Sequence, residues 1–249
     1  MSLELFRAEA LTCVFPDGSR GLDSVSLTIS EGEFLVLAGR NGAGKSLLMR
    51  HFVGLSRPTS GKLWYRGREL ASQIRTVRRE VGYVFQDTEA QIFGQTVEED
   101  LAFGPANLGL KGAELEDAVS SALREARLEG MTLRRPTSLS GGEKRRLAIA
   151  GVLAMRPSCI ILDEPFANLD FPSVQEVLAI LDSLRDEGKT VIVLTHEIEK
   201  VFARAHRIVI MDSGRVVRDG LPADLLPEAF AQAGLVCPYL EQYPWLIRS

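Results

Sequence analysis

The spacing of hydrophobic and polar positions changes along the chain, and the first third predicts strands. Residues 24–30 alternate strictly, so Val25, Leu27 and Ile29 are expected on one face of a half-buried strand. Residues 34–38 form a short, uniformly apolar run, which is typical of a strand buried on both faces. The N-terminal third is therefore predicted to be mainly β.

The rest of the chain predicts helices first and then an α/β alternation. Apolar residues recur at helical spacing between residues 115 and 126, and a second helix is expected over residues 141–155, ending before Pro157. Further on, strands are predicted at 159–162, 191–194 and 208–211, and a helix at 174–184. Strands that alternate with helices indicate a mostly parallel sheet.

Composition narrows the class of protein. The chain has 249 residues, of which 45% are hydrophobic and 25% charged, as in a soluble globular protein. Its longest apolar run, residues 147–155, is far shorter than the roughly 20 residues of a membrane-spanning helix, and the first ten residues lack the pattern of a secretory signal. Cys13, Cys159 and Cys237 are odd in number and widely spaced, which favours a reducing cytosol. The net charge of -4 argues against a nucleic-acid partner.

A glycine-rich loop follows the apolar run at residues 34–38. It matches G-x-x-x-x-G-K-[ST] in full, with Gly39, Arg40, Asn41, Gly42, Ala43, Gly44, Lys45 and Ser46. Glycines let the backbone wrap a phosphate, and a helix expected from about Lys45 adds its N-terminal N–H groups. Lys45 is predicted to reach the β- and γ-phosphates and Ser46 to ligate Mg²⁺. A plain glycine-rich turn is the alternative, and the flanking strand and helix argue against it.

Two adjacent acids end the strand predicted at 159–162. Ligands of open α/β sheets bind at the carboxyl ends of strands, so Asp163 is expected to face Mg²⁺ and Glu164 to polarise the attacking water. A helix N-cap with a solvated neighbour is the alternative for this pair alone. The phosphate loop elsewhere in the chain favours the catalytic interpretation.

A second helix start has an unusual composition. Ser140 and Glu143 fit a capping box, while Gly141 and Gly142 occupy the first turn, where glycine is costly. That cost is understandable if a phosphate must come close to the backbone, so a second anion-binding helix end is predicted. By itself, the motif also fits an ordinary N-cap.

These motifs resemble, in sequence order, those of the ATP-binding-cassette family. They read GRNGAGKS, LSGGE and CIILDE, followed by Ala-Asn-Leu-Asp at 167–170 and Thr-His at 195–196. The resemblance implies an α/β fold: a P-loop NTPase with a RecA-like core, an N-terminal antiparallel β subdomain and an inserted α-helical subdomain. The chain is then one nucleotide-binding domain. Its β subdomain and core span 1–86 and 156–220, its helical subdomain with the signature motif spans 87–155, and its tail spans 221–249. The tail as a whole has no predicted place, and its aromatic residues 238–245 fit either packing on the core or contact with a partner.

The resemblance also implies ATP and Mg²⁺ as cofactors and a role for each matching residue. Gln86 is expected at Mg²⁺, where it senses a membrane partner, and His196 at the γ-phosphate. Phe15 is expected to stack on adenine, with packing in the core as the alternative. Leu47 follows Ser46 where threonine is more usual. Two ATPase subunits, identical or related, are expected to pair head to tail, so that the phosphate loop of one and Ser140, Gly141 and Gly142 of the other close on each ATP, with Asp170 at the interface. In the signature motif of the family, LSGGE in this chain, glutamine is commoner at the position that Glu143 occupies.

The segment after Gln86 points to one branch of the family. Residues 84–87, 91–93, 96–100 and 103–110 resemble the ATPase components of energy-coupling-factor importers, the cobalt, nickel and vitamin group. That resemblance implies a peripheral ATPase on the cytoplasmic face of the membrane, bound to an integral membrane component beside a small substrate-capture membrane protein. Residues 94–112 are a candidate moving joint, or else a structural linker. The alternatives are another ABC transporter branch or a non-transport ABC ATPase.

Overall fold

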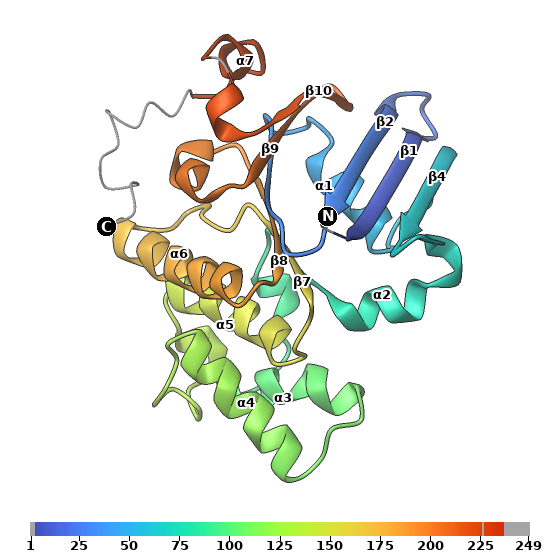
Figure 1. Cartoon of the computed structure of the whole chain (residues 1–249). Helices are drawn as coiled ribbons and strands as arrows, with labels where there is room; N and C mark the ends of the chain where they lie inside the picture. The colour runs from blue at the N-terminus through green and yellow to red at the C-terminus, as the bar shows by residue number, and fades with distance from the viewer. Residues whose placement is uncertain (1–2, 226, 237–249) are drawn as a thin grey trace.

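The strands form two sheets in the computed structural model, which describes residues 3–225 and 227–236 (Figure 1). The first sheet is antiparallel, in the order β2-β1-β4-β5, and consists of β1 (Glu4–Val14), β2 (Arg20–Ser30), β4 (Ser60–Tyr65) and β5 (Arg68–Glu69). The second has the order β10-β9-β3-β8-β7-β6 and consists of β3 (Phe34–Ala38), β6 (Val81–Val84), β7 (Cys159–Asp163), β8 (Thr190–Thr195), β9 (Arg207–Asp212) and β10 (Arg215–Gly220). Neighbouring strands of this second sheet are parallel, except that β9 and β10 are antiparallel. The predicted α/β fold with an added antiparallel sheet is confirmed.

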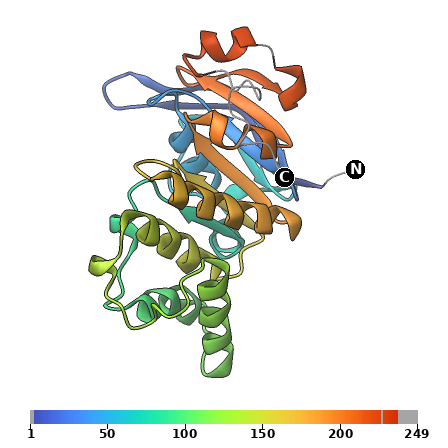
Figure 2. The same ribbon diagram turned by 90° about the vertical axis from the view of Figure 1, so that its left-hand side faces the viewer.

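Helices surround the larger sheet and extend beyond it. They are α1 (Lys45–Phe52), α2 (Ile74–Glu80), α3 (Val97–Asn107), α4 (Ala113–Glu125), α5 (Gly141–Leu153), α6 (Phe171–Asp186) and α7 (Pro227–Gln232). Figures 1 and 2 show α3 and α4 at the end of the molecule opposite β10 and α7, with α5 between them and the sheets. Within the described residues, every helix is too short or too polar to cross a lipid bilayer.

The predicted strands and helices are present, with some changed ends. Val25, Leu27 and Ile29 are all buried on one face of β2, as the alternation indicates. The helix expected at 141–155 ends at Leu153. The helix expected at 174–184 begins earlier, because the Asp170 carboxylate accepts the Ser173 N–H and caps it.

The larger sheet has a hydrophobic core on each face, and β3 contributes to both. Leu35 and Leu37 pack with α1 and the antiparallel sheet, whereas Phe34 and Val36 pack with α5 and α6. All four side chains are fully buried. The strand that precedes the phosphate loop is thereby fixed from two sides.

The described part of the tail completes the second of these cores. Phe230 of α7 and Leu235 are buried, and the Phe230 ring meets Phe202 edge-on with centroids 6.0 Å apart. Phe202 begins the short helix Phe202–Arg204, which follows β8. Packing on the core is thus observed for α7 and Leu235, while the aromatic residues 238–245 lie outside the described residues.

Truncation of Phe230 tests this packing. Phe230→Ala should lower the free energy of unfolding by about 3 kcal/mol, because it leaves a cavity in a closed core. Urea titration followed by circular dichroism measures the change. Val236→Ala, at an exposed position, should leave the midpoint unchanged, and equal effects of the two variants would contradict the packing.

Candidate functional site

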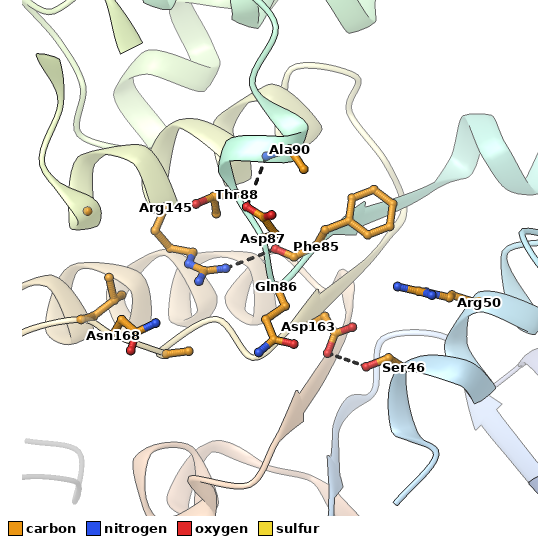
Figure 3. Close-up of a pocket in the computed structure, with 13 residues that line it drawn as sticks. Ser46, Arg50, Phe85, Gln86, Asp87, Thr88, Ala90, Arg145, Asp163 and Asn168 are labelled. Atoms are coloured by element: carbon orange, nitrogen blue, oxygen red, sulfur yellow. Dashed lines mark hydrogen bonds between the residues drawn. The ribbon is translucent and has the colours of Figure 1, made fainter. Parts of the chain in front are cut away.

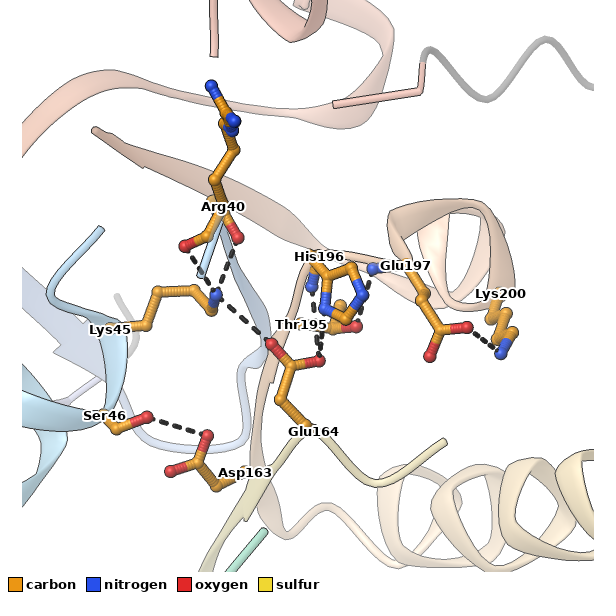
Figure 4. A network of polar contacts seen from close by, with 10 residues as sticks. Arg40, Lys45, Ser46, Asp163, Glu164, Thr195, His196, Glu197 and Lys200 are labelled. Carbon is orange, nitrogen blue, oxygen red and sulfur yellow. Dashed lines mark hydrogen bonds and ion pairs between the residues drawn. The ribbon is translucent and has the colours of Figure 1, made fainter. Parts of the chain in front are cut away.

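Three neighbouring strands bring the predicted site residues together at one edge of the sheet. In the order β3-β8-β7, the glycine-rich loop follows β3, His196 follows β8, Asp163 ends β7, and Glu164 comes directly after it. Because these strands are parallel, their carboxyl ends lie at the same edge. Figure 4 shows the side chains converging there.

The glycine-rich loop leaves the start of α1 open to an anion. Gly44 is the N-cap residue, with a φ of 99°, and no side chain caps the helix. A Cβ at Gly44 would lie 2.9 Å from the Gly21 carbonyl oxygen, so a larger residue would displace the backbone. The first N–H groups of α1 are therefore donors without a side-chain cap, which suits a phosphate.

Lys45 is buried among acceptors. Its Nζ donates to the carbonyl oxygens of Gly39, at 2.6 Å, and Arg40, at 3.2 Å, and lies 3.2 Å from Glu164 Oε1. Both side chains are about 5% exposed or less. An ammonium held at the mouth of the loop can turn to a phosphate oxygen with a small movement of its flexible chain.

The Glu164 carboxylate lies between Lys45 and His196. Its Oε2 is 3.0 Å from His196 Nδ1, and the His196 side chain is 43% exposed. Glu164 has a φ of 47°, in the left-handed region, which is a strained conformation for a residue with a side chain and is common at functional sites. A proton donated from Nδ1 to Oε2 leaves the His196 Nε2 for another group. The arrangement has the parts of a general base oriented by its neighbours.

Asp163 is held by two hydroxyl groups. Ser46 Oγ donates to Oδ1 and the Tyr83 hydroxyl donates to Oδ2, both at 2.9 Å. Burial raises the pKa of the Asp163 carboxyl, while these hydrogen bonds favour the ionised form and act in the opposite direction. Tyr83 lies on β6, beside β7, and sequence analysis missed it because only the strand order places it there.

Gln86 projects into a cavity of about 630 Å³ beside this pair (Figure 3). Ser46, Asp163, Asn168 and Gly141 line the same cavity. Hydroxyl, carboxylate and amide oxygens are the donors that Mg²⁺ prefers. The three predicted metal residues therefore share one cavity and fit the expected ion in chemistry.

Phe15 and Leu47 meet at a corner next to the loop. A Cβ built on Gly21 would lie 2.7 Å from the Phe15 ring and 2.4 Å from Leu47, so both side chains cover Gly21. Phe15 is 43% exposed. The turn fixes it, since its N–H donates to the Ser19 carbonyl oxygen. The ring is half open, as a stacking surface requires, and is not enclosed in the core.

Helix α5 is called the signature helix here because it begins within the LSGGE signature motif, and its first turn forms the predicted capping box. Ser140 Oγ accepts the Glu143 N–H at 3.2 Å, and Glu143 Oε2 accepts the Ser140 N–H at 2.7 Å. Gly141 has open space where a Cβ would stand, as an approaching phosphate requires. A Cβ at Gly142 would lie 2.1 Å from Ser173 Oγ, so close packing against α6 also favours glycine there. The phosphate contact of the two glycines stays a prediction.

Ser140 and Asp170 do not join the Lys45 cluster. Both are exposed, and each caps a helix of its own chain, α5 and α6. Hydrogen bonds from Ser173 hold the pKa of Asp170 below its usual range. These two residues are accessible to a second molecule.

Comparisons with known proteins agree on one family. Residues 22–167 match the family described as ABC transporter. The chain is 40% identical over 229 residues to the energy-coupling factor transporter ATP-binding protein EcfA of Methanocaldococcus jannaschii, covering 90% of this chain and 82% of that protein. It is 42% identical over 239 residues to the cobalt import ATP-binding protein CbiO of Rhodobacter capsulatus, covering 94% and 85%.

Solved structures have the same fold. CbiO1 from Clostridium perfringens, described as part of the ABC transporter complex CbiONQ, superposes with a TM-score of 0.83 at 33% identity, covering 98% of this chain and 97% of that one. The ATP-binding cassette MJ0796, a dimer bound to ADP and phosphate after hydrolysis, superposes with a TM-score of 0.78 at 30% identity, covering 88% and 99%.

Removal of the Tyr83 hydroxyl tests the role of its hydrogen bond. The bond favours ionised Asp163, so Tyr83→Phe should raise the pKa of that carboxyl and move the acid limb of ATP hydrolysis to higher pH. The Mg²⁺ concentration for half-maximal rate should rise on the order of tenfold. Steady-state rates across pH and Mg²⁺ measure both effects.

Tyr65→Phe is the matched control. The Tyr65 hydroxyl donates to Glu80 Oε2 instead, so its loss should leave both the pH profile and the Mg²⁺ requirement as in the wild type. If both variants showed the same shift of the pH profile and the same rise in the Mg²⁺ requirement, the effect would not be specific to Asp163.

Proposed function

The chain belongs to the ABC transporter family and is an ATPase, and from this premise we propose that it hydrolyses MgATP to drive a membrane importer of the energy-coupling-factor type. The observation that carries the proposal is the buried Glu164 carboxylate, with Lys45 at one oxygen and His196 at the other. Such a carboxylate can take a proton from water beside a triphosphate.

The residues of the cluster have separate tasks in this proposal. Lys45 turns to the β- and γ-phosphates, which frees Glu164 Oε1 from its ion pair. His196, oriented through Nδ1 by Glu164, presents Nε2 to the γ-phosphate. Glu164 accepts the proton of the attacking water.

Ser46, Asp163 and Gln86 would hold Mg²⁺ at the shared cavity. The ion would supply positive charge against the phosphate oxygens. The Tyr83 hydrogen bond keeps Asp163 available as a carboxylate there, against the effect of burial.

The rest of the nucleotide is assigned to the loop and its surroundings. The backbone of residues 39–44 and the first turn of α1 cradle the phosphates. Phe15 stacks on adenine, and Leu47 packs beside it over Gly21.

Two chains pair head to tail around two ATP molecules in this proposal. Ser140 and the open turn at Gly141 face the γ-phosphate held by the other chain, and Asp170 crosses the interface. Ser140 and Asp170 are exposed and lie outside the Lys45 cluster, which supports a role toward a second chain. ATP favours the closed pair and ADP the open one, and this difference in affinity drives transport.

An apolar groove between α3 and α5 is the proposed docking place of an integral membrane component. Phe93 and Phe103 are 67% and 55% exposed, and their rings lie 5.8 Å apart. A cavity of about 260 Å³ adjoins them, with Gly104, Gly151 and Met155 in its wall. The buried Asp100 carboxylate accepts the N–H groups of Phe93 and Gly94, which fixes the edge of the groove. Exposed aromatic pairs of this kind are typical of interaction sites.

The importer type is inferred from the segment after Gln86 and from the relatives named for energy coupling and cobalt import. We infer a cobalt or nickel ion or a vitamin as cargo, captured by a separate small membrane protein. The ATPase then acts at the cytoplasmic face of the membrane.

Glu164→Gln tests the catalytic assignment. The variant keeps the shape of the side chain but cannot accept a proton, so it should bind ATP, form a stable dimer and hydrolyse ATP at least about a hundredfold more slowly. Phosphate release and size-exclusion chromatography with MgATP measure the two effects.

Glu197→Gln is the matched control, a change of the same kind next to His196. The Glu197 carboxylate pairs with Lys200, so this variant should hydrolyse ATP normally. A wild-type rate in Glu164→Gln contradicts the assignment of the base, and a chain that stays monomeric in both forms with ATP contradicts the mechanism.

Phe103→Asp tests the groove. A charge in an apolar contact should abolish capture of the membrane component from detergent-solubilised native membranes, with ATP hydrolysis by the isolated chain unchanged. Leu221→Asp, at an equally exposed apolar residue after β10 at the opposite end of the molecule, is the control (Figure 1). Mass spectrometry should identify an integral scaffold with a small capture protein. A conventional permease with a soluble binding protein would indicate another transporter branch, and soluble or nucleic-acid-associated partners alone would indicate a non-transport ATPase.

A further inference from the structure

The signature helix of this chain has a carboxylate in the turn that is proposed to receive a phosphate. Glu143 Oε2 accepts the Ser140 N–H at 2.7 Å, which places a negative charge next to the proposed phosphate contact. Like charges in a closing interface repel and weaken binding. A glutamine would satisfy the same cap without the charge.

Arg134 approaches this carboxylate from the preceding turn. Its Nη1 lies 3.3 Å from Glu143 Oε1, and its Nη2 donates to the Ser138 carbonyl oxygen at 2.8 Å. One guanidinium nitrogen thus contacts Glu143, which follows Ser140, and the other contacts Ser138, which precedes it. Hydrogen bonding from the Ser140 backbone is the main reason that the pKa of Glu143 is lowered, and Arg134 acts in the same direction.

The backbone fixes Arg134 in that place. Its N–H donates to the Met131 carbonyl oxygen at 2.8 Å, and its carbonyl oxygen accepts the Val97 N–H at 3.0 Å, at the start of α3. The Arg134 side chain, 42% exposed, therefore begins from a fixed backbone position within reach of Glu143. A preorganised ion pair loses less entropy on formation than one between two free side chains.

The other cations of α5 have different partners. Lys144 pairs with Glu89, Arg146 pairs with Glu176, and Arg145 donates to the Phe85 carbonyl oxygen. Arg146 also lowers the pKa of Glu143 through its charge, but after Arg134 in order of effect and without an ion pair to Glu143. Among the ion pairs of the described residues, the one that Glu143 forms is with Arg134.

We propose that Arg134 is a positioning residue for ATP-driven dimer closure: it neutralises Glu143 and keeps that carboxylate in the cap, so that Ser140 can meet the γ-phosphate held by the partner protomer. The inference rests on the proposed function, since it needs the head-to-tail dimer. It adds a residue outside the five family motifs and explains how this chain accommodates glutamate in its signature.

The test removes the charge of Arg134 and then the charge that it neutralises. In the Glu164→Gln background, Arg134→Gln should raise the ATP concentration for half-maximal dimerisation about three- to tenfold at low salt. With Glu164 intact, the KM for ATP should rise in parallel, while kcat changes by less than about twofold. High salt should reduce the difference, because screening weakens the repulsion. Thermal unfolding of the variant, compared with that of the wild type, establishes that it is folded.

The double variant separates charge from structure. Arg134→Gln with Glu143→Gln should return the ATP requirement to within about twofold of the wild type, because no charge remains to be neutralised. Arg135→Gln is the matched control: Arg135 is exposed, and its contact with Ser138 is through its backbone carbonyl oxygen, which accepts the Ser138 N–H and hydroxyl and is kept in the variant. It should behave as the wild type.

The possible failures are distinguishable. If Arg134→Gln needs no more ATP than the wild type, or if Glu143→Gln does not rescue it, then Arg134 does not act through Glu143 and the inference is wrong while the proposed function stands. If Glu164→Gln never dimerises with ATP, both fail together.

Discussion

A desolvated carboxylate between a lysine and a histidine is the interaction on which the rest of the site depends. The Glu164 side chain is almost fully buried, so its charge lacks water and must be stabilised by the protein. Lys45 and His196 supply that stabilisation from two other strand ends, and neither is near Glu164 in the sequence. The order β3-β8-β7 is therefore a requirement of the electrostatics as well as of the fold.

Sequence patterns predicted the parts of the site that are local in the chain. The phosphate loop and the capping box at Ser140 depend on residues within a few positions of one another, and both have the expected backbone. Tyr83 could not be found in this way, because it meets Asp163 only through the pairing of β6 with β7. The packing of Phe230 on Phe202 is equally non-local, and the tail therefore had no predicted place. The packing of Gly142 against Ser173 is non-local too, and the phosphate prediction for that glycine had no need of it.

Among the described helices, α1 and α5 are those whose starts are proposed to meet phosphate, and the two starts are built differently. The start of α1 has no side-chain cap and offers its own N–H groups. The start of α5 has a capping box of Ser140 and Glu143, so part of its backbone donors is used within the chain. The first therefore suits a phosphate bound deep in the loop, whereas the second suits a lighter, reversible contact. That difference agrees with a proposed dimer in which ATP stays bound to one chain while the other chain associates and dissociates.

The position of β3 in the sheet has a consequence for biosynthesis. Its hydrogen-bonded neighbours are β8 and β9, which begin roughly 150 residues later in the chain. At about 5–20 residues per second, the ribosome needs roughly 8 to 30 s to supply them. During that interval an entirely apolar strand is synthesised but has no partner on either edge, and exposed strands of this kind aggregate. The strand that precedes the glycine-rich loop is thus a segment of the nascent chain that is prone to aggregate until β8 and β9 have been made.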